Sequence, residues 1–327
     1  LVAGDAFDDN LVGAQTCARA LAAMRGFTGP WVLLPGNHDA DTAASVWSRL
    51  RRGGLPAHVI VADEPAPLIL CDGRLAVLPA PLKARRVAED LTAWMDGAVT
   101  PAGAVRIGLA HGSVLGVLPD EADAANPIAL DRAERAGLDY LALGDWHGTL
   151  QLGARTWYAG TPEPDRFTTN AAGHVLLVEA DRGASPRVKA HPTGQYSWHT
   201  AVLDCTGHDE RTVAAAAEAR LPPPETRHRA LVRLRLEGVV GLAVRTTLGE
   251  VAERLAGELL WLDLIDDALA DAPDEHDMRA LSRWPATAAA AHRLQEIIAT
   301  GADQDRDVAR QALRLLYAEA AALEAGA

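Results

Sequence analysis

The sequence is poor in basic residues relative to acidic ones. It has 31 Lys and Arg against 44 Asp and Glu, which gives a formal net charge of −13. A protein that coats nucleic acid relies on Lys and Arg to neutralise phosphates, so this charge weighs against that class. It does not exclude a nuclease, because bound metal ions supply positive charge locally.

Cysteines and long apolar runs are also lacking. Cys17, Cys71 and Cys205 are far apart and odd in number, so they give neither a metal-binding spacing nor a disulfide framework. This cysteine usage predicts a reducing cytoplasm. No apolar run reaches the length of a membrane span, so we expect no membrane association. No signal peptide is evident, and the chain begins at Leu1 within a predicted strand, so we expect it to be truncated at its N-terminus.

Apolar residues are plentiful and follow alternating strand and helix patterns. The 327 residues suffice for about two domains, and 49% of them are apolar. Strands alternating with helices predict an α/β fold with a parallel sheet. A change of composition near residue 195 predicts domains over 1–194 and 195–272 and a helical segment over 273–327. The strands are expected at 31–34, 67–70, 74–78, 105–110, 140–143, 156–159, 174–180, 187–191, 230–236 and 262–265, and the helices at 13–25, 42–52, 128–136, 247–260, 286–299 and 303–324.

One short strand, over 31–34, runs into a turn that presents three polar side chains in succession. The turn contains Gly36, and the polar residues are Asn37, His38 and Asp39. A strand that ends in this way delivers donors and acceptors to the carboxyl edge of a sheet, where open α/β folds bind their ligands. The turn therefore predicts a functional site at that edge.

Three other predicted strand ends carry polar residues beside glycine. They supply Asp5, His111 and the pair Asp145 and His147. Carboxylate, amide and imidazole groups are the mixed ligands that suit Mn, Fe or Zn. Because cysteine is absent from the set, a structural zinc site is not expected.

A two-metal centre gives each of these groups a role. Two ions ~3.5–4 Å apart can clamp a phosphate, generate hydroxide and stabilise the leaving oxygen, and Asp5 is the natural bridging carboxylate. His38 is expected to protonate the leaving group or to steady the phosphoryl oxygens, with Asp39 orienting its ring. Asp8 is expected to support the site rather than bind metal. Ser113 lacks a Gly-x-Ser-x-Gly elbow, so we interpret it as a turn serine and not a nucleophile.

Four segments together resemble successive blocks of the calcineurin-like metallophosphoesterases. The segments are Gly4-Asp5-x-x-Asp8, Gly36-Asn37-His38-Asp39, His111-Gly112 and Gly144-Asp145-x-His147. Within that superfamily, the Gly-Asp-Ala-Phe-Asp run at 4–8 and the Trp-Tyr-Ala-Gly-Thr-Pro-Glu run at 157–163 resemble the SbcD-type DNA repair exonucleases. The resemblance covers roughly residues 1–190.

The resemblance implies a four-layer α/β/β/α sandwich with a small α+β capping domain, C-terminal helices and a two-metal centre usually served by manganese, with Fe, Zn or Mg as alternatives. By position, Asp5 would bridge the ions. Asn37, His111 and Asp145 would complete one metal site, His147 would belong to the other, and His38 would be the catalytic histidine. The C-terminal helices would dock on an SMC-like ATPase of the SbcC type. The helix over 303–324 has an apolar face that packing against the capping domain would equally explain.

Two departures from the family pattern bear on the site. The first family block, Asp-x-His, has no counterpart here, so one metal site is expected to lack two ligands. The last block usually reads Gly-His-x-His, whereas Asp145 stands in place of its first His. A carboxylate still binds a hard divalent ion, so we expect either an altered metal preference or the loss of one metal.

Three functions remain open from the sequence. The first is a DNA exonuclease or endonuclease acting in repair, with DNA, an SMC-like ATPase and a second copy of the chain as expected partners. The second is a small-molecule phosphodiesterase or phosphatase, which the net acidity suits slightly better. The third is a catalytically weakened scaffold subunit, suggested by Asp145 and the absent first block.

Overall fold

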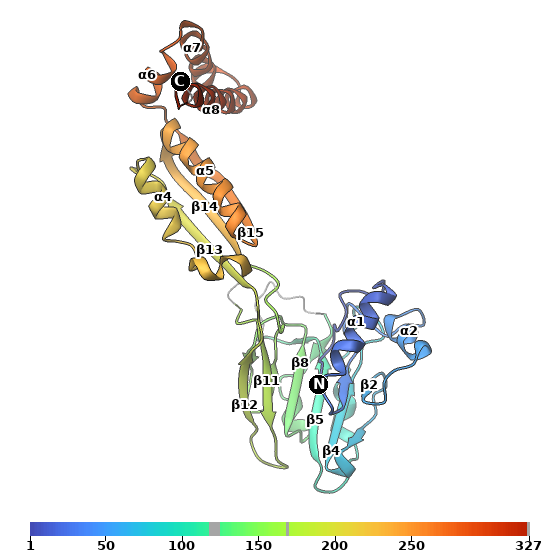
Figure 1. Ribbon diagram of the computed structural model, residues 1–327. Coiled ribbons are helices and arrows are strands. Elements are labelled where there is room, and N and C mark those ends of the chain that lie inside the picture. Colours follow the sequence, from blue (N-terminus) through green and yellow to red (C-terminus); the bar gives the residue numbers. More distant parts are fainter. Residues whose placement is uncertain (118–124, 168–169, 326–327) are drawn as a thin grey trace. The chain divides into compact units, whose positions relative to one another are not determined.

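The computed structural model describes residues 1–117, 125–167 and 170–325, and the chain divides into two units (Figure 1). The first unit comprises Leu1–Asp165 and Thr169–Gly194, and the second comprises Arg166–Thr168 and Gln195–Ala327. Each unit has hydrophobic clusters of its own. Within the described ranges, no helix has both the length and the apolar character needed to cross a membrane.

Two sheets form the frame of the first unit. In the smaller sheet, β1 pairs in parallel with β2, and Val2 bridges in parallel to Leu33. The larger sheet has the order β3-β4-β5-β8-β10-β9, and only its outer pairs, β3 with β4 and β9 with β10, are antiparallel. The strands of these sheets are β1 (Trp31–Leu33), β2 (Val59–Val61), β3 (Leu68–Leu70), β4 (Leu75–Ala80), β5 (Val105–His111), β8 (Tyr140–Gly144), β9 (Leu150–Gln151) and β10 (Thr156–Tyr158).

The remaining elements of this unit are short or lie outside the two sheets. The antiparallel pair β11 and β12 forms a hairpin, and β6 pairs in parallel with β7. Their bounds are β6 (Ser113–Val114), β7 (Pro127–Ile128), β11 (His174–Glu179) and β12 (Arg187–Pro192), and the helices are α1 (Ala14–Met24), α2 (Val46–Gly53), η1 (Cys71–Gly73), η2 (Ala93–Gly97) and α3 (Arg132–Arg135).

Side chains alternate between the faces of both sheets, as the pleat of a strand requires. Val32 and Leu34 share a cluster with Val77 and Leu109 of the larger sheet, so the two sheets pack face to face. Leu33 points the other way, into a cluster with residues of α1 and α2. The opposite face of the larger sheet packs on residues of η2 and α3. The structure is therefore a mixed α/β fold with a mostly parallel sheet, as the sequence predicted.

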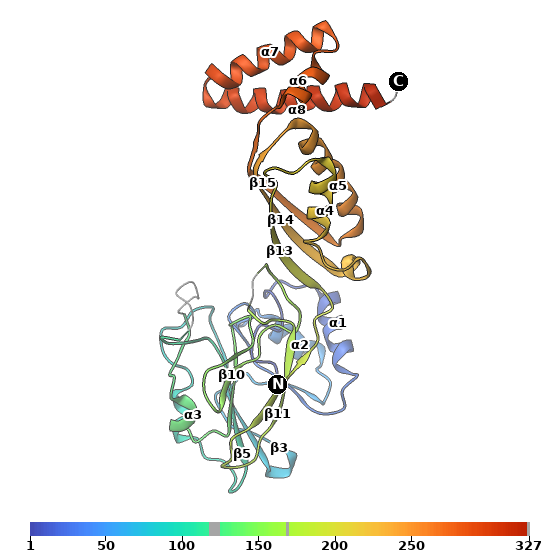
Figure 2. The ribbon, with the colours of Figure 1, turned by 90° about the vertical axis from the view of Figure 1, so that its left-hand side faces the viewer.

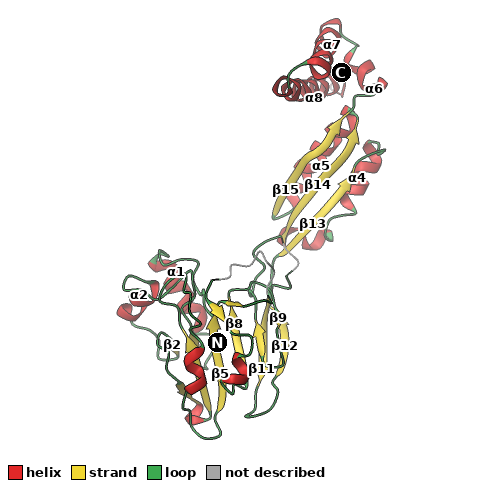
Figure 3. Ribbon diagram, turned by 180° about the vertical axis from the view of Figure 1, so that it is seen from behind, coloured by secondary structure: helices red, strands yellow, loops and turns green. Residues whose placement is uncertain are grey.

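The second unit begins with a three-stranded parallel sheet of order β13-β14-β15. Its strands are β13 (Ser197–Asp204), β14 (Ala230–Val240) and β15 (Trp261–Asp271), connected through α4 (Glu210–Glu218) and η3 (Pro224–Arg229) and through α5 (Leu242–Glu258). Val232, Leu234 and Leu236 of β14 are buried against α4 and α5. Figure 1 shows these helices in front of the strands, and Figure 3 shows the same strands from the face that carries no helix.

Three helices complete the second unit: α6 (Glu275–Leu281), α7 (Pro285–Thr300) and α8 (Asp303–Ala325). Figure 2 shows α7 and α8 running side by side. Leu313, Tyr317 and Ala320 of α8 are buried in a cluster that also contains residues of α6 and α7. Most of the apolar face noted in the sequence is thus used for packing within the chain.

Several sequence predictions of local structure are confirmed and one is wrong. The strands predicted at 67–70 and 74–78 form the antiparallel pair β3 and β4, and the two C-terminal helices lie where expected. The helix predicted over 128–136 is wrong. Ile128 belongs to β7, and helix forms only over Arg132–Arg135, where the Arg132 guanidinium is buried between Asp90 and Asp96. These ion pairs join residues 36 and 42 positions apart in the chain, so an apolar period cannot reveal them.

Trp47 links the core of the first unit to the loop after β1. Its ring is fully buried, packs edge-on against Phe7, and donates a hydrogen bond to the Asp39 carbonyl. We expect Trp47→Ala to reduce the free energy of unfolding by about 3–5 kcal/mol, because it leaves a large cavity. Val99→Ala, at a side chain that is 87% exposed, should stay within about 0.5 kcal/mol of the parent. Urea denaturation of both variants measures the difference, and equal midpoints would contradict this packing.

Candidate functional site

The imidazole of His111 lies at the centre of the residues predicted to form the site. His111 is the last residue of β5, and its side chain is 1% exposed. Its Nε2 atom lies 3.0 Å from Asn37 Oδ1, 3.3 Å from Asp5 Oδ2 and 3.6 Å from Asp145 Oδ1. The structure thus brings together four of the five predicted metal ligands, from four separate strand ends.

The other ring nitrogen fixes the tautomer of His111. Its Nδ1 lies 2.8 Å from the carbonyl oxygen of Ala3. A carbonyl only accepts hydrogen bonds, so Nδ1 must carry a hydrogen and donate it. In the neutral ring, Nε2 then carries a lone pair, and this lone pair faces the carboxylates of Asp5 and Asp145. Such an arrangement is favourable only when a proton or a cation stands between Nε2 and these oxygens.

The electrostatics of the cluster follow from burial and close charges. Burial lowers the pKa of His111, but the hydrogen bond with Asp5 and the charges of Asp5 and Asp145 together raise it above its ordinary value. Burial raises the pKa of Asp5, but its contacts with His111 and the His38 backbone N–H outweigh this and hold it below its ordinary value. Burial raises the pKa of Asp145, although the neighbouring His111 opposes the rise. The cluster therefore favours positive charge at His111.

Two glycines let the site residues approach one another. A Cβ on Gly4 would lie 2.1 Å from His111 Nδ1, and a Cβ on Gly36 would lie 2.2 Å from Asp5 Oδ1. Neither space could hold a side chain. These glycines explain why the candidate ligands occur beside glycine in the sequence.

Two of the candidate ligands have a backbone conformation that non-glycine residues rarely adopt. Asp5 has φ of 50° and Asp145 has φ of 97°. Holding such residues in the left-handed region costs about 1–3 kcal/mol each, and strain of this kind concentrates at functional sites. The fold therefore maintains these two carboxylates in position against their local preference.

Asp39 has a different role from the one predicted. It is fully buried, and its carboxylate accepts hydrogen bonds from the backbone N–H of Gly36 at 2.7 Å and of Phe7 at 3.1 Å. Burial raises its pKa to about 6. The prediction that Asp39 orients the His38 ring is wrong, because Asp39 instead ties the loop after β1 to the loop that follows Asp5.

The ring of His38 is positioned by Asp8. His38 Nδ1 lies 2.9 Å from the Asp8 carbonyl oxygen and 4.0 Å from its carboxylate, and the His38 side chain is 40% exposed. The backbone N–H of His38 donates to Asp5 Oδ1 at 2.9 Å. Since a carbonyl can only accept, Nδ1 carries the hydrogen and Nε2 is the atom left to meet a ligand. Asp8 therefore supports the site, as the sequence suggested.

His147 lies beside the cluster but contacts a different partner. Its Nδ1 is 2.6 Å from Asp165 Oδ2. The loop over 160–165 holds it in place, since the Thr161 backbone N–H donates to the His147 carbonyl at 2.9 Å. Sequence reasoning marked residues 157–163 as part of the family resemblance. It missed Asp165, because a single Asp after a Pro-rich loop has no distinctive spacing.

Two further residues of the site were not recognised as such from the sequence. The Ser113 hydroxyl donates to Asp145 Oδ2 at 3.4 Å. The buried Tyr158 hydroxyl donates to the Gly112 carbonyl at 2.7 Å and accepts from the Val114 N–H at 3.0 Å, and its burial raises its pKa. Tyr158 thereby fixes the turn after His111. Only its position in the Trp-Tyr-Ala-Gly-Thr-Pro-Glu run marked it in the sequence.

The side chains of Asp5, Asn37, His111 and Asp145 are suitable ligands for a divalent cation, although here their polar atoms contact one another. Among residues 1–117, 125–167 and 170–325, no three His, Cys, Asp or Glu side chains are disposed as a ready metal site. Yet two carboxylates, an amide oxygen and an imidazole nitrogen are borderline-to-hard ligands for ions such as Mn or Fe. A cation bound between His111 Nε2 and the carboxylates of Asp5 and Asp145 would accept the Nε2 lone pair and balance their negative charge.

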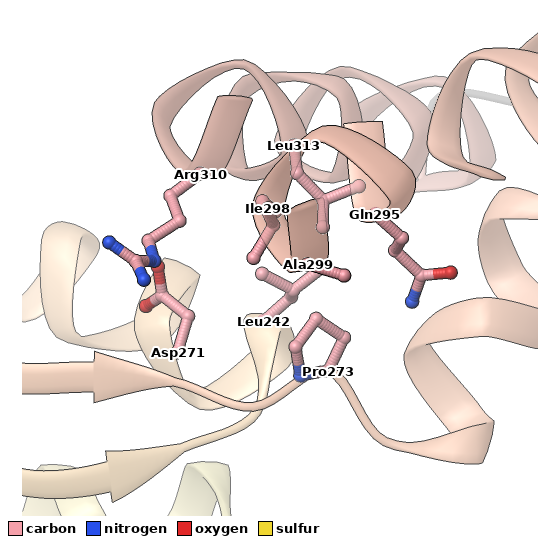
Figure 4. A pocket seen from close by; sticks show the side chains of 8 residues that line it. All are labelled: Leu242, Asp271, Pro273, Gln295, Ile298, Ala299, Arg310 and Leu313. Atoms are coloured by element: carbon pink, nitrogen blue, oxygen red, sulfur yellow. The ribbon is translucent and has the colours of Figure 1, made fainter. Parts of the chain in front are cut away.

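A cavity of moderate size lies in the second unit, within the part of the chain that the structure describes. It has a volume of about 240 Å³ and lies between the end of β15, the start of α5 and the helices α7 and α8. Figure 4 shows Leu242, Ile298 and Leu313 among the side chains around it. Its lining contains none of the predicted site residues. It is chiefly apolar, with Asp271, Gln295 and Arg310 as its polar members.

Comparison with known proteins adds no relative. No protein-family model matches the chain, and no curated protein matches it.

Removing one carboxylate should change the titration of His111. In chelator-treated protein, we expect Asp5→Asn to lower the pKa of His111, because burial then dominates over the remaining Asp145 charge. An NMR titration of the His111 Hε1 resonance measures this. With a folded pKa above the ordinary 6.5, protonated His111 stabilises the fold below that pH, and the contribution is lost as the pH rises through the raised pKa.

A matched control separates this effect from a change in overall charge. Asp72→Asn removes the same charge at an exposed position in η1, and it should leave the His111 titration unchanged. If Asp5→Asn and Asp72→Asn gave the same His111 pKa, the contact between Asp5 and His111 would be wrong.

Proposed function

We propose that this chain is a metal-dependent phosphoesterase that hydrolyses phosphodiester bonds. The observation that carries the proposal is the convergence of Asp5, Asn37 and Asp145 on Nε2 of His111. The resemblance of the same four strand-end blocks to the calcineurin-like metallophosphoesterases supports it. The packing of two sheets face to face, with helices on each outer face, supports a four-layer α/β/β/α sandwich.

The residues around His111 are proposed to hold one divalent ion, with manganese as the first expectation. Asp5, Asn37, His111 and Asp145 would be its ligands, and the bond from His111 Nδ1 to Ala3 would keep Nε2 turned toward it. His147 is proposed to take part in a second site, with Asp165 orienting its ring and Asp5 shared between the ions. Bound ions would supply a hydroxide nucleophile and neutralise phosphoryl charge.

His38 is proposed as the general acid. Its Nδ1 hydrogen is held by the Asp8 carbonyl, so Nε2 of the protonated ring would donate to the leaving oxygen. Asn37, which precedes His38 in the chain, is a proposed ligand. The backbone N–H of His38 donates to Asp5, so His38 lies next to the cluster. Asp39 contributes by holding the backbone of this loop rather than by touching the reacting atoms.

The proposed substrate is DNA, and the proposed setting is repair in the cytoplasm with an SMC-like ATPase. These proposals rest on the resemblance of residues 4–8 and 157–163 to the SbcD-type exonucleases. The buried face of α8 is used for internal packing, so an ATPase would have to meet other side chains. Val308, Leu315 and Leu323 of α8 are 61–64% exposed and are the candidates.

A second candidate function is hydrolysis of a small phosphodiester or phosphate ester. The net charge of −13 favours it, because a long polyanion meets more repulsion than a small substrate does. A chain without turnover on either kind of substrate would instead be a scaffold subunit.

Substrate class can be decided by one set of assays. With Mn²⁺, we expect the chain to degrade linear DNA and to hydrolyse bis(nitrophenyl) phosphate slowly, because one metal site is expected to lack two ligands, and we expect a chelator to abolish both activities. Diester turnover without DNA cleavage would favour the small-molecule function. An absence of turnover on both substrates, with Mn²⁺, Fe²⁺, Zn²⁺ and Mg²⁺ each tested, would overturn the proposed activity.

The proposed general acid has its own kinetic signature. His38→Ala should lower kcat by roughly 10²–10⁴-fold, because proton transfer to the leaving group is lost. A diester with a nitrophenolate leaving group needs little protonation, so the loss should be smaller for it than for DNA. His292→Ala, at an exposed histidine of α7, is the matched control. Equal losses for both substrates would show that His38 does not act as an acid.

Asp145 can be tested by metal affinity rather than by activity. Asp145→Asn keeps the shape of the side chain but removes its charge, so Mn²⁺ affinity should fall by roughly tenfold or more. Isothermal titration of chelator-treated protein with Mn²⁺ gives the constant and the number of ions bound. Unchanged affinity would exclude Asp145 as a ligand.

A further inference from the structure

The cavity of the second unit has mostly apolar walls. It lies between the end of β15, the start of α5 and the helices α7 and α8, and its volume is about 240 Å³. Figure 4 shows Ile298, Ala299 and Leu313 of the helices on one side of it, and Leu242 and Pro273 on the other. An aliphatic cavity of about 150 Å³ is large enough to hold benzene. This cavity therefore has room for one substituted ring.

A buried carboxylate in the lining of this cavity has an oxygen without a hydrogen-bond partner. The Asp271 side chain is 5% exposed, and its Oδ2 accepts a hydrogen bond from Arg314 Nε. Its Oδ1 lies 3.9 Å from Arg245 Nε, too far for a hydrogen bond, and has no partner in the part of the chain that the structure describes. An unsatisfied buried acceptor is destabilising. Because the torsion that turns an Asp carboxylate is soft, a donor in the cavity can meet Oδ1 after a small turn.

The charged groups at this end of the cavity balance one another. Among the described residues, three ion pairs lie at the lining or directly behind Asp271, and they are Arg245–Asp266, Arg310–Asp307 and Arg314–Asp271. This set offers no unpaired counter-ion to a charged ligand, and a charge that enters an apolar site without a counter-ion pays a large desolvation penalty. Gln295, the third polar residue of the lining, is neutral. The cavity therefore favours a neutral ligand.

We propose that the cavity binds a small neutral molecule with an apolar body and one hydroxyl group, such as a phenol or an alicyclic alcohol. The apolar body would contact Leu242, Ile298 and Leu313, and the hydroxyl would donate to Asp271 Oδ1. A hydroxyl suits this place better than an amine or a carboxylic acid, since it donates a hydrogen bond and carries no charge at neutral pH.

A ligand in this place would connect two parts of the second unit. Leu242 begins α5 and Asp271 ends β15, whereas Ile298 and Leu313 belong to α7 and α8. By contacting both sets, the ligand would stabilise the packing of the C-terminal helices against the end of the sheet. The inference goes beyond the proposed function, because it involves neither a metal ion nor a phosphoester.

Two probes of the same shape isolate the contribution of the hydroxyl. 4-Methylphenol carries this group, and p-xylene has a methyl group in its place. NMR titrations of the full chain in EDTA, followed at the methyl groups of Ile298 and Leu313, should give an affinity for 4-methylphenol that is roughly tenfold higher, because p-xylene cannot donate a hydrogen bond to a carboxylate. 4-Methylbenzoate and 4-methylbenzylamine should bind more weakly than 4-methylphenol, because each brings a charge into the cavity.

A bulky residue at the rim tests the location. Ala299 lines the cavity and is exposed, so Ala299→Phe occupies part of the space without overfilling a core. The affinity for 4-methylphenol should fall by roughly tenfold or more. Ala289→Phe is the matched control, at an exposed alanine of α7 outside the lining, and it should bind like the parent chain.

Asp271→Asn tests the proposed acceptor. The preference for 4-methylphenol over p-xylene should fall from roughly tenfold to roughly threefold, because a charge-assisted hydrogen bond is about twice as strong as a neutral one. Thermal melting checks that this variant is folded. Asp267→Asn removes a charge from an exposed position of β15 outside the lining, so it should leave the preference unchanged.

Four results would overturn the inference. The first two are the absence of methyl shifts at Ile298 and Leu313 with 4-methylphenol, and equal affinity of the parent chain for 4-methylphenol and p-xylene. The third is equal binding by Ala299→Phe and Ala289→Phe, which would place the ligand elsewhere. The fourth is tighter binding of either charged analogue, which would contradict the charge balance. A failure of the proposed phosphoesterase activity would leave all of these titrations unchanged.

Discussion

A buried hydrogen bond from the His111 ring to the Ala3 carbonyl fixes the arrangement on which the candidate site depends. It commits one ring nitrogen to the backbone and leaves the other facing Asp5 and Asp145. Two carboxylates around a buried imidazole are stable only with positive charge between them, as a proton or as a metal ion. The neighbouring glycines and the left-handed backbone at both aspartates serve this one geometry.

The loops around the cluster are held by backbone contacts rather than by packing alone. Asp39 joins the loop after β1 to the loop after Asp5, Tyr158 holds the turn after His111, and the loop over 160–165 holds His147. Buried groups of this kind leave little freedom to the residues that they position. The candidate ligands are therefore preorganised by the fold, which is what metal binding and phosphoryl chemistry both require.

In the second unit, the helices α4 and α5 cover only one face of the parallel sheet. Two crossover connections place α4 and α5 on the same face of β13, β14 and β15. The core on that side is complete, whereas the other side presents Trp261, Arg235 and the Phe167–Trp198 pair.

The sequence by itself determined the α/β class, most of the strands and the identity of the candidate ligands. Strand periodicity and glycine beside a polar residue are local signals, and Asp5, Asn37 and His111 carry both. Tertiary structure alone decided which groups meet. It paired His147 with Asp165, and it gave Asp39 backbone partners in place of the His38 ring. It also shortened the helix predicted over 128–136 to α3, whose Arg132 pairs with Asp90 and Asp96. The physical reason is that the contacts of His147 with Asp165, of Asp39 with Phe7 and of Arg132 with Asp90 join residues 18, 32 and 42 positions apart. No local spacing encodes such contacts.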